Sequence, residues 1–150
     1  MYNKFEYVSL RDLFSKSDII SLHCPLTKTT RHIINNGSLS LVKPDCILLN
    51  TSRGGLIDTD ALVKALKLKK IGGAALDVYE EEGNYFFNDW SEDIITDDIL
   101  ARLMTFPNVI ITAHQGYLTD DALKAIAMTT LQNVWHFENK DTLDNIIFAS

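Results

Sequence analysis

The sequence is poor in the residues that mark several classes of protein. It has two cysteines in 150 residues, too few for a disulfide-stabilised secreted scaffold. Cys24 and Cys46 lie in or beside short apolar runs, so we expect buried free thiols in a reducing compartment. No apolar stretch approaches the roughly 20 residues that a membrane helix needs, and residues 1–6 do not resemble a signal peptide. We therefore expect a cytoplasmic protein without a membrane partner.

An excess of positive charge is also lacking. The 14 lysines and arginines are outnumbered by 20 aspartates and glutamates, which gives a formal net charge of -6. Nucleic acids require a basic surface, so this charge argues against a nucleic-acid partner. With 46% hydrophobic and 23% charged residues, the composition is that of an ordinary globular protein, and the length suits about one domain.

Apolar runs and helical patterns alternate along the chain. Buried strands are predicted for the short apolar runs at residues 18–22, 46–49, 72–78 and 108–112. Helices are predicted from capping residues and apolar spacing at residues 9–17, 58–70, 97–104 and 119–137. Residues 79–95 show no clear period and are predicted to form a long loop. This alternation predicts an α/β fold with a parallel sheet and right-handed crossovers.

The stretch LNTSRGGLID at residues 49–58 joins the second predicted strand to the helix that follows. Ligands collect at the carboxyl ends of parallel strands. Arg53 in this position suits a carboxylate or a phosphate, and Gly54 and Gly55 allow a backbone to come close. The stretch alone fits equally well an Arg53 that only donates hydrogen bonds to carbonyl groups of the loop.

Two further strand ends carry polar groups. An acidic run ending at Glu82 follows the third predicted strand, and His114 follows the fourth. Because the ends of parallel strands meet at one edge, Arg53, a carboxylate and His114 are expected to converge. A histidine beside a carboxylate can hold a proton and release it to a developing alkoxide. Alone, His114 would be interpreted as structural, but the matching strand ends favour acid–base chemistry.

The other histidines carry weaker signals. His23 ends the first strand beside Cys24 and Pro25, where the backbone suits a flat ligand, although a structural role is the better interpretation. His32 lies on a polar turn and His136 on a helix. No histidine pair has the spacing of a metal site with further support, so no metal is expected.

Four motifs, taken together, resemble those of the NAD-dependent D-isomer-specific 2-hydroxyacid dehydrogenases. They are HCPLT at 23–27, NTSRGGLID at 50–58, LDVYE at 76–80 and PNVIITAH at 107–114. Within that family, HQGYLT at 114–119 and the aromatic residues at 84–87 are most similar to fermentative D-lactate dehydrogenases. The resemblance spans nearly the whole chain and implies part of a Rossmann-like, doubly wound parallel sheet.

The resemblance also implies a role for each matching residue. Arg53 would bind the substrate carboxylate, His114 would protonate the carbonyl oxygen, and Glu82 would hold that histidine. Glu82 is chosen from the acidic run because the family glutamate lies five residues after the position of Asp77. NAD would lie along a group of residues at the strand ends: Cys24, Pro25, Thr30, Thr51, Ser52, Arg53 and Asp77. The implied reaction is hydride transfer between NAD(H) and a 2-hydroxy or 2-keto acid, with D-lactate and pyruvate as first choice.

The chain departs from the family in its glycines. They fall at positions 37, 54, 55, 72, 73, 83 and 116, so no Gly-x-Gly-x-x-Gly phosphate loop is present. We therefore expect the C-terminal portion of a longer enzyme, inactive alone, whose last helix would pack on an absent substrate domain. It would self-associate or need a complementing N-terminal portion, because its first strand would become an open edge. A non-catalytic interaction module remains an alternative, as does another substrate such as glyoxylate, a phosphoglycerate or a branched 2-keto acid.

Overall fold

The computed structural model describes residues 5–87, 94 and 96–139. The chain forms two compact units, one that ends at His114 and one that begins at Gln115. None of the described helices is both long enough and apolar enough to span a bilayer.

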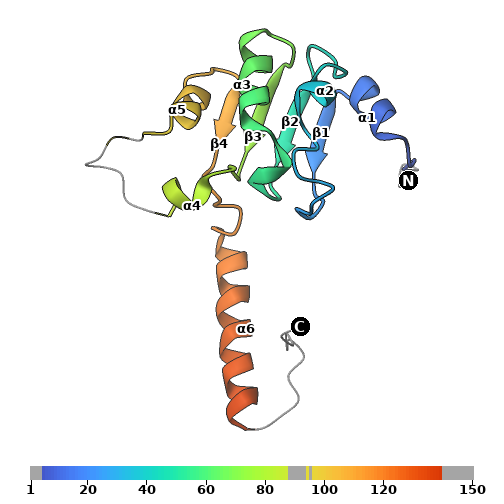
Figure 1. The fold of residues 1–150 in the computed structure, drawn as a ribbon. Coiled ribbons are helices and arrows are strands. Elements are labelled where there is room, and N and C mark those ends of the chain that lie inside the picture. Colours follow the sequence, from blue (N-terminus) through green and yellow to red (C-terminus); the bar gives the residue numbers. More distant parts are fainter. Residues whose placement is uncertain (1–4, 88–93, 95, 140–150) are drawn as a thin grey trace. The chain divides into compact units, whose positions relative to one another are not determined.

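The first unit is built around a four-stranded parallel sheet (Figure 1). Its strands lie side by side in chain order: β1 (Ile19–Leu22), β2 (Ile47–Asn50), β3 (Gly73–Leu76) and β4 (Val109–Ile111). In the register, Leu22 pairs with Asn50 and Asn50 pairs with Leu76. All four carboxyl ends therefore reach the same edge of the sheet, which confirms the predicted parallel α/β fold. β1 is an edge strand, as expected for this chain.

Helices connect the strands at most of the predicted places. They are α1 (Leu10–Lys16), α2 (Asn36–Leu39), the 3-10 helix η1 (Gly54–Leu56), α3 (Thr59–Lys67), α4 (Glu82–Tyr85), α5 (Asp98–Met104) and, in the second unit, α6 (Asp120–Glu138). Side chains accept hydrogen bonds from first-turn amides at the starts of the four predicted helices: Ser9, Asp58, Asp97 and Thr119. The predicted helix at 58–70 ends early because Lys69 adopts a left-handed conformation with φ 53°.

The prediction of a loop for residues 79–95 is wrong in part. Glu82–Tyr85 forms the short helix α4. A helix of four residues makes barely one turn, so it leaves no periodic pattern to detect. Residues 88–93 and 95 of the predicted loop lie outside the described residues.

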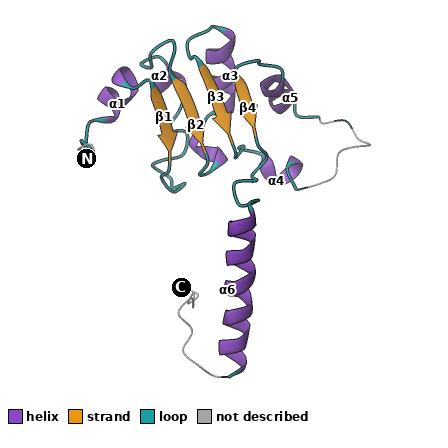
Figure 2. Ribbon diagram, turned by 180° about the vertical axis from the view of Figure 1, so that it is seen from behind, coloured by secondary structure: helices purple, strands orange, loops and turns teal. Residues whose placement is uncertain are grey.

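The core lies between one face of the sheet and the helices. Ile20, Leu48 and Leu76 are buried on this face, together with Leu62 of α3 and Leu103 of α5. Figure 2 shows the opposite face, where no helix of the described first unit lies in front of the strands. Ile19 and Ile110 are accordingly 62% and 64% exposed. The described residues of this unit thus supply the helical layer of one face of the sheet.

Candidate functional site

The turn after β2 holds Arg53 at the carboxyl edge of the sheet. A Cβ atom at Gly54 would lie 2.0 Å from the carbonyl oxygen of Tyr79, so the chain after β3 packs directly on this turn. This confirms the predicted close approach of a backbone at Gly54, whereas the nearest atoms at Gly55 belong to the side chains of Leu26 and Arg31. The Arg53 side chain is exposed and donates from Nη1 to the carbonyl of Ser52 at 2.7 Å. Within the described part of the chain Arg53 forms no ion pair, so its guanidinium is available to bind an anion.

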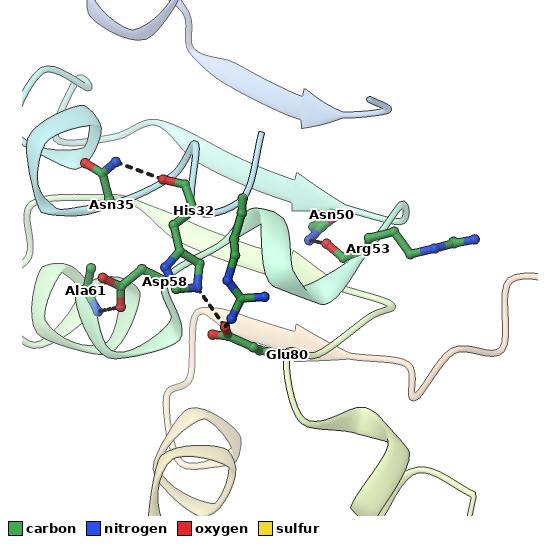
Figure 3. A network of polar contacts seen from close by, with 8 residues as sticks. His32, Asn35, Asn50, Arg53, Asp58, Ala61 and Glu80 are labelled. Carbon is green, nitrogen blue, oxygen red and sulfur yellow. Dashed lines mark hydrogen bonds and ion pairs between the residues drawn. The ribbon is translucent and has the colours of Figure 1, made fainter. Parts of the chain in front are cut away.

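Asn50 fixes the shape of that turn from inside the protein. Its side chain is fully buried, donates from Nδ2 to the carbonyl of Arg53 at 2.9 Å (Figure 3) and accepts from the amide of Ser52 at 3.1 Å. Its carbonyl accepts from the amide of Asp77 on the next strand at 2.9 Å. Asn50 was not among the predicted site residues, although a polar residue at the end of an apolar strand was a usable signal.

Glu82 and His114 are in contact. The Nδ1 atom of His114 lies 3.1 Å from Oε1 of Glu82, and the two side chains are 34% and 20% exposed. The other carboxylate oxygen of Glu82 accepts from the amide of Tyr79 at 3.0 Å. Because a carboxylate only accepts, Nδ1 carries the proton of this bond, and Nε2 is left for a substrate. The pair is suited to acid–base chemistry.

The backbone around His114 is strained and strongly held. Ala113 and His114 both adopt left-handed conformations, with φ 53° and 56°, at a cost of about 1–2 kcal/mol per residue. The amide of His114 donates to the carbonyl of Asp77 at 2.5 Å, and Thr112 donates from Oγ1 to Oδ1 of Asp77 at 2.5 Å. The Phe87 ring lies 6.0 Å from the imidazole between centroids. These contacts fix where the imidazole projects.

Two cavities lie near the carboxyl ends of the strands, the first of them on the sheet face that the described helices of the first unit leave bare. One of about 340 Å³ has apolar walls from Leu49, Ala75 and Ile110, with Thr51 and Asp77 as polar groups. Its neighbour, of about 560 Å³, is lined by five residues: His23, Pro25, Leu26, Ser52 and Arg53. His23 lines both cavities, and its Nε2 lies 2.8 Å from Oγ of Ser21. The cavities therefore follow the edge that ends in Arg53.

The residues predicted to contact NAD divide into two groups. Thr51 and Asp77 line the first cavity, and Pro25, Ser52 and Arg53 line the second. Cys24 and Thr30 line neither. The carbonyl of Cys24 accepts from Oγ of Ser52 at 2.8 Å, and Thr30 donates from Oγ1 to the carbonyl of Pro25 at 2.7 Å, so both shape the loop.

The lining of the first cavity is compatible with the nicotinamide end of NAD. Its apolar walls suit an aromatic ring, and Asp77 and Thr112 supply polar groups. The pyrophosphate end has no matching glycine loop in this sequence. The residues of this chain thus suit the nicotinamide end of NAD but not its pyrophosphate.

The structure brings together part of the predicted catalytic trio. Glu82 and His114 touch, whereas Arg53 lies at the same sheet edge without a hydrogen bond or ion pair to either among the described residues. Both cysteines are free thiols, as predicted, but only Cys46 is buried, whereas Cys24 is partly exposed. Burial raises the pKa of Cys46. Across residues 5–87, 94 and 96–139, no three His, Cys, Asp or Glu side chains form a group that could hold a metal ion.

A family model described as D-isomer specific 2-hydroxyacid dehydrogenase, NAD binding domain, matches residues 2–116. The chain belongs to this family. It is 54% identical over 140 residues to 2-hydroxyacid dehydrogenase A of Aspergillus oryzae, a match that covers 93% of the chain and 40% of that protein. It is 49% identical over 140 residues to D-lactate dehydrogenase of Escherichia coli, covering 93% of the chain and 43% of that protein. These findings confirm the resemblance drawn from the four motifs.

Solved structures of the family share the fold. The crystal structure of D-lactate dehydrogenase with NAD+ from Lactobacillus jensenii superposes with a TM-score of 0.88 at 32% identity, over 95% of this chain and 43% of that one. The chain thus spans 40% to 43% of the length of these relatives. The comparisons establish the family of the chain and its NAD-binding domain.

Proposed function

We propose that the chain is part of an oxidoreductase of the D-lactate dehydrogenase type, which transfers a hydride between NAD(H) and a 2-keto acid, with pyruvate as first choice. The observation that carries this proposal is the Glu82–His114 pair, at the same sheet edge as the exposed guanidinium of Arg53. Reduction of a 2-keto acid needs a cation for the carboxylate and an acid for the carbonyl oxygen. These groups supply both.

In this proposal three side chains act on the substrate. Arg53 binds the substrate carboxylate through two parallel hydrogen bonds and so orients the carbonyl. His114 donates its Nε2 proton to the carbonyl oxygen as negative charge develops there, and accepts it again in the reverse reaction. Glu82 holds the imidazole by Nδ1 and stabilises its charged form. NAD(H), when bound, supplies or accepts the hydride.

The cofactor contacts follow from the two cavities. Asp77 and Thr51 would hold the nicotinamide end, and Pro25, Ser52 and Arg53 would border the next part of the cofactor. Cys24 and Thr30 would act by shaping the loop between them. The glycine loop for the pyrophosphate would come from a complementing N-terminal portion.

A second candidate is a non-catalytic interaction module. The open edge of β1 and the exposed side chains on the bare sheet face favour it, because unpaired strand edges recruit other chains. Self-association of the chain would use the same surfaces.

The decisive experiment joins the chain to the portion of E. coli D-lactate dehydrogenase that precedes the matched region. We expect NADH oxidation with pyruvate from the fusion and none from the chain alone. His114→Ala should lower kcat by about 10²–10⁴-fold, and Arg53→Ala should chiefly raise the KM for pyruvate. Lys64→Gln, at an exposed position of α3 that lines neither cavity, serves as the control.

Two results would contradict the proposal. One is a folded fusion that binds NADH but reduces none of pyruvate, glyoxylate, phosphohydroxypyruvate and a branched 2-keto acid, which would favour the interaction module. The other is an unchanged KM in Arg53→Ala. Among active outcomes, the ratio of kcat/KM values for the four acids identifies the substrate.

A further inference from the structure

Glu80 links two loops that lie far apart in the sequence. Its Oε1 atom accepts from Nη2 of Arg31 at 2.9 Å and from Nε2 of His32 at 2.7 Å. Figure 3 shows the bond to His32, with Arg53 extending away from it. The Glu80 side chain is only 18% exposed, so this contact is partly shielded from water and from salt. Sequence analysis treated Glu80 as part of an acidic run and His32 as a turn residue.

Both backbone polar groups of His32, the amide and the carbonyl, form hydrogen bonds. Its amide donates to the carbonyl of Gly55 at 2.9 Å, and its carbonyl accepts from Nδ2 of Asn35 at 2.8 Å. It adopts a left-handed conformation with φ 52°, which persists in a non-glycine residue only when neighbouring contacts enforce it. One residue thus bonds to the turn that carries Arg53 and to the carboxylate of Glu80.

Glu80 lies within the segment that places Glu82. The amide of Tyr79 donates to Oε2 of Glu82, and the carbonyl of Tyr79 occupies the space where Gly54 would otherwise carry a Cβ atom. Residues 79–82 therefore contact the Arg53 turn through Tyr79 and His114 through Glu82. A displacement of Glu80 would move Glu82 with it.

We propose that Arg31, His32 and Glu80 form a clamp that positions Glu82 against His114 and seats the Arg53 turn. The clamp residues touch neither the cavity walls nor His114 in the described contacts, so they are positioning residues. Their importance for catalysis rests on the proposed function, whereas their effect on the Glu82–His114 contact does not.

The test reads the proton on the His114 ring in the 150-residue chain itself. A free neutral imidazole carries its proton mainly on Nε2, whereas the bond to Glu82 selects Nδ1. Long-range ¹H–¹⁵N spectra recorded at alkaline pH distinguish the two neutral forms. We expect mainly the Nδ1–H form in the unaltered chain.

Two variants break the clamp in different ways. Arg31→Gln removes a cation, and His32→Asn keeps a residue that tolerates the left-handed conformation but shortens its reach. In both, His114 should shift to mainly the Nε2–H form while far-ultraviolet circular dichroism stays unchanged. Glu80→Gln, which keeps size and shape, should give the same shift should either variant fail to fold. Lys28→Gln, a charge loss in the same loop, should cause no shift.

Failure of the clamp and failure of the proposed function give different spectra. If folded Arg31→Gln, His32→Asn and Glu80→Gln all keep the Nδ1–H form, the clamp is wrong and the catalytic pair stands. If the unaltered chain already shows mainly the Nε2–H form, the Glu82–His114 contact is wrong, and the proposed function and the clamp lose their common basis.

Discussion

Helices α3 and α6 begin in the same way but differ in how much of each helix is buried. Each starts at a side chain that accepts a first-turn hydrogen bond, Asp58 for α3 and Thr119 for α6. Of the nine residues of α3, five are buried, whereas none of the nineteen residues of α6 is buried. Capping and apolar spacing therefore establish that a helix forms, and burial depends on a partner that these local signals do not identify.

The largest difference is expected for one leucine in each helix. Leu62 is 0% exposed and Leu131 is 64% exposed. Leu62→Ala should lower the free energy of unfolding by about 2–5 kcal/mol, because it leaves a cavity in the core. Leu131→Ala should change it by less than about 0.5 kcal/mol. Urea unfolding followed by circular dichroism measures both, and equal losses would show that α6 has a packed partner in solution.

Two glycines sharpen the contrast between packed and open positions. Gly54→Ala would place a Cβ atom against the Tyr79 carbonyl, whereas a Cβ atom at Gly83 meets nothing within 4 Å. The first change should destabilise the chain by about 1–3 kcal/mol, since backbone must move. Gly83→Ala, within α4, should be neutral or stabilise by up to about 1 kcal/mol. Urea midpoints provide the comparison, and a Gly54→Ala protein as stable as Gly83→Ala would refute the close packing of the two loops.

The helix caps give a smaller effect. The Asp58 carboxylate accepts from the amide of Ala61 at 3.0 Å, so Asp58→Ala should cost about 1 kcal/mol of unfolding free energy. Thr119→Ala removes the equivalent bond from α6 and should leave unfolding of the first unit unchanged, with helix content alone reduced. Loss of stability in both variants would indicate that the two units unfold together.

The smallest effect is expected at alkaline pH. Burial, followed by the hydrogen bond to Asp97, raises the pKa of Tyr79 above its ordinary value. A group whose folded pKa is raised stabilises the fold fully below its unfolded pKa of about 10, and this contribution is lost as pH rises further. Between pH 8 and about 10.5, Tyr79→Phe should therefore lose less stability than the unaltered chain.

Tyr117 provides the matched control, because it is 52% exposed. Tyr117→Phe should follow the unaltered chain at both pH values. Urea midpoints at each pH settle the comparison, and identical pH dependence in all three proteins would show that the Tyr79 hydroxyl is not buried in solution.

The sequence predicted the elements that local chemistry specifies. The four strands appear where apolar runs lie between turn residues, and the four periodic helices appear behind their capping side chains. The parallel arrangement followed from their alternation, and the convergence of a carboxylate with His114 followed from the shared direction of their strands. The family resemblance singled out Glu82 within the acidic run, and Glu82 does contact His114. These inferences need only local sequence patterns and the rule that crossovers between parallel strands are right-handed.

The rest depends on contacts between distant residues. Arg31 and His32 meet Glu80 across 49 and 48 positions, and no local pattern marks that pairing. The short helix α4 lacks a period, and the left-handed turn at Ala113 and His114 is held by Asp77 from the neighbouring strand. The resemblance to a known family predicted site residues but gave no sign of the bonds from Ser52 to the carbonyl of Cys24 and from Thr30 to the carbonyl of Pro25.

The strand order β1-β2-β3-β4 has a consequence for biosynthesis. Among the described strands, β2, β3 and β4 each pair with the strand made immediately before them, so each can be added to a strand that is already in place. None of these three strands must wait for a later one, which limits how long apolar edges stay uncovered during translation. This part of the sheet can therefore assemble in a single direction, from β1 to β4.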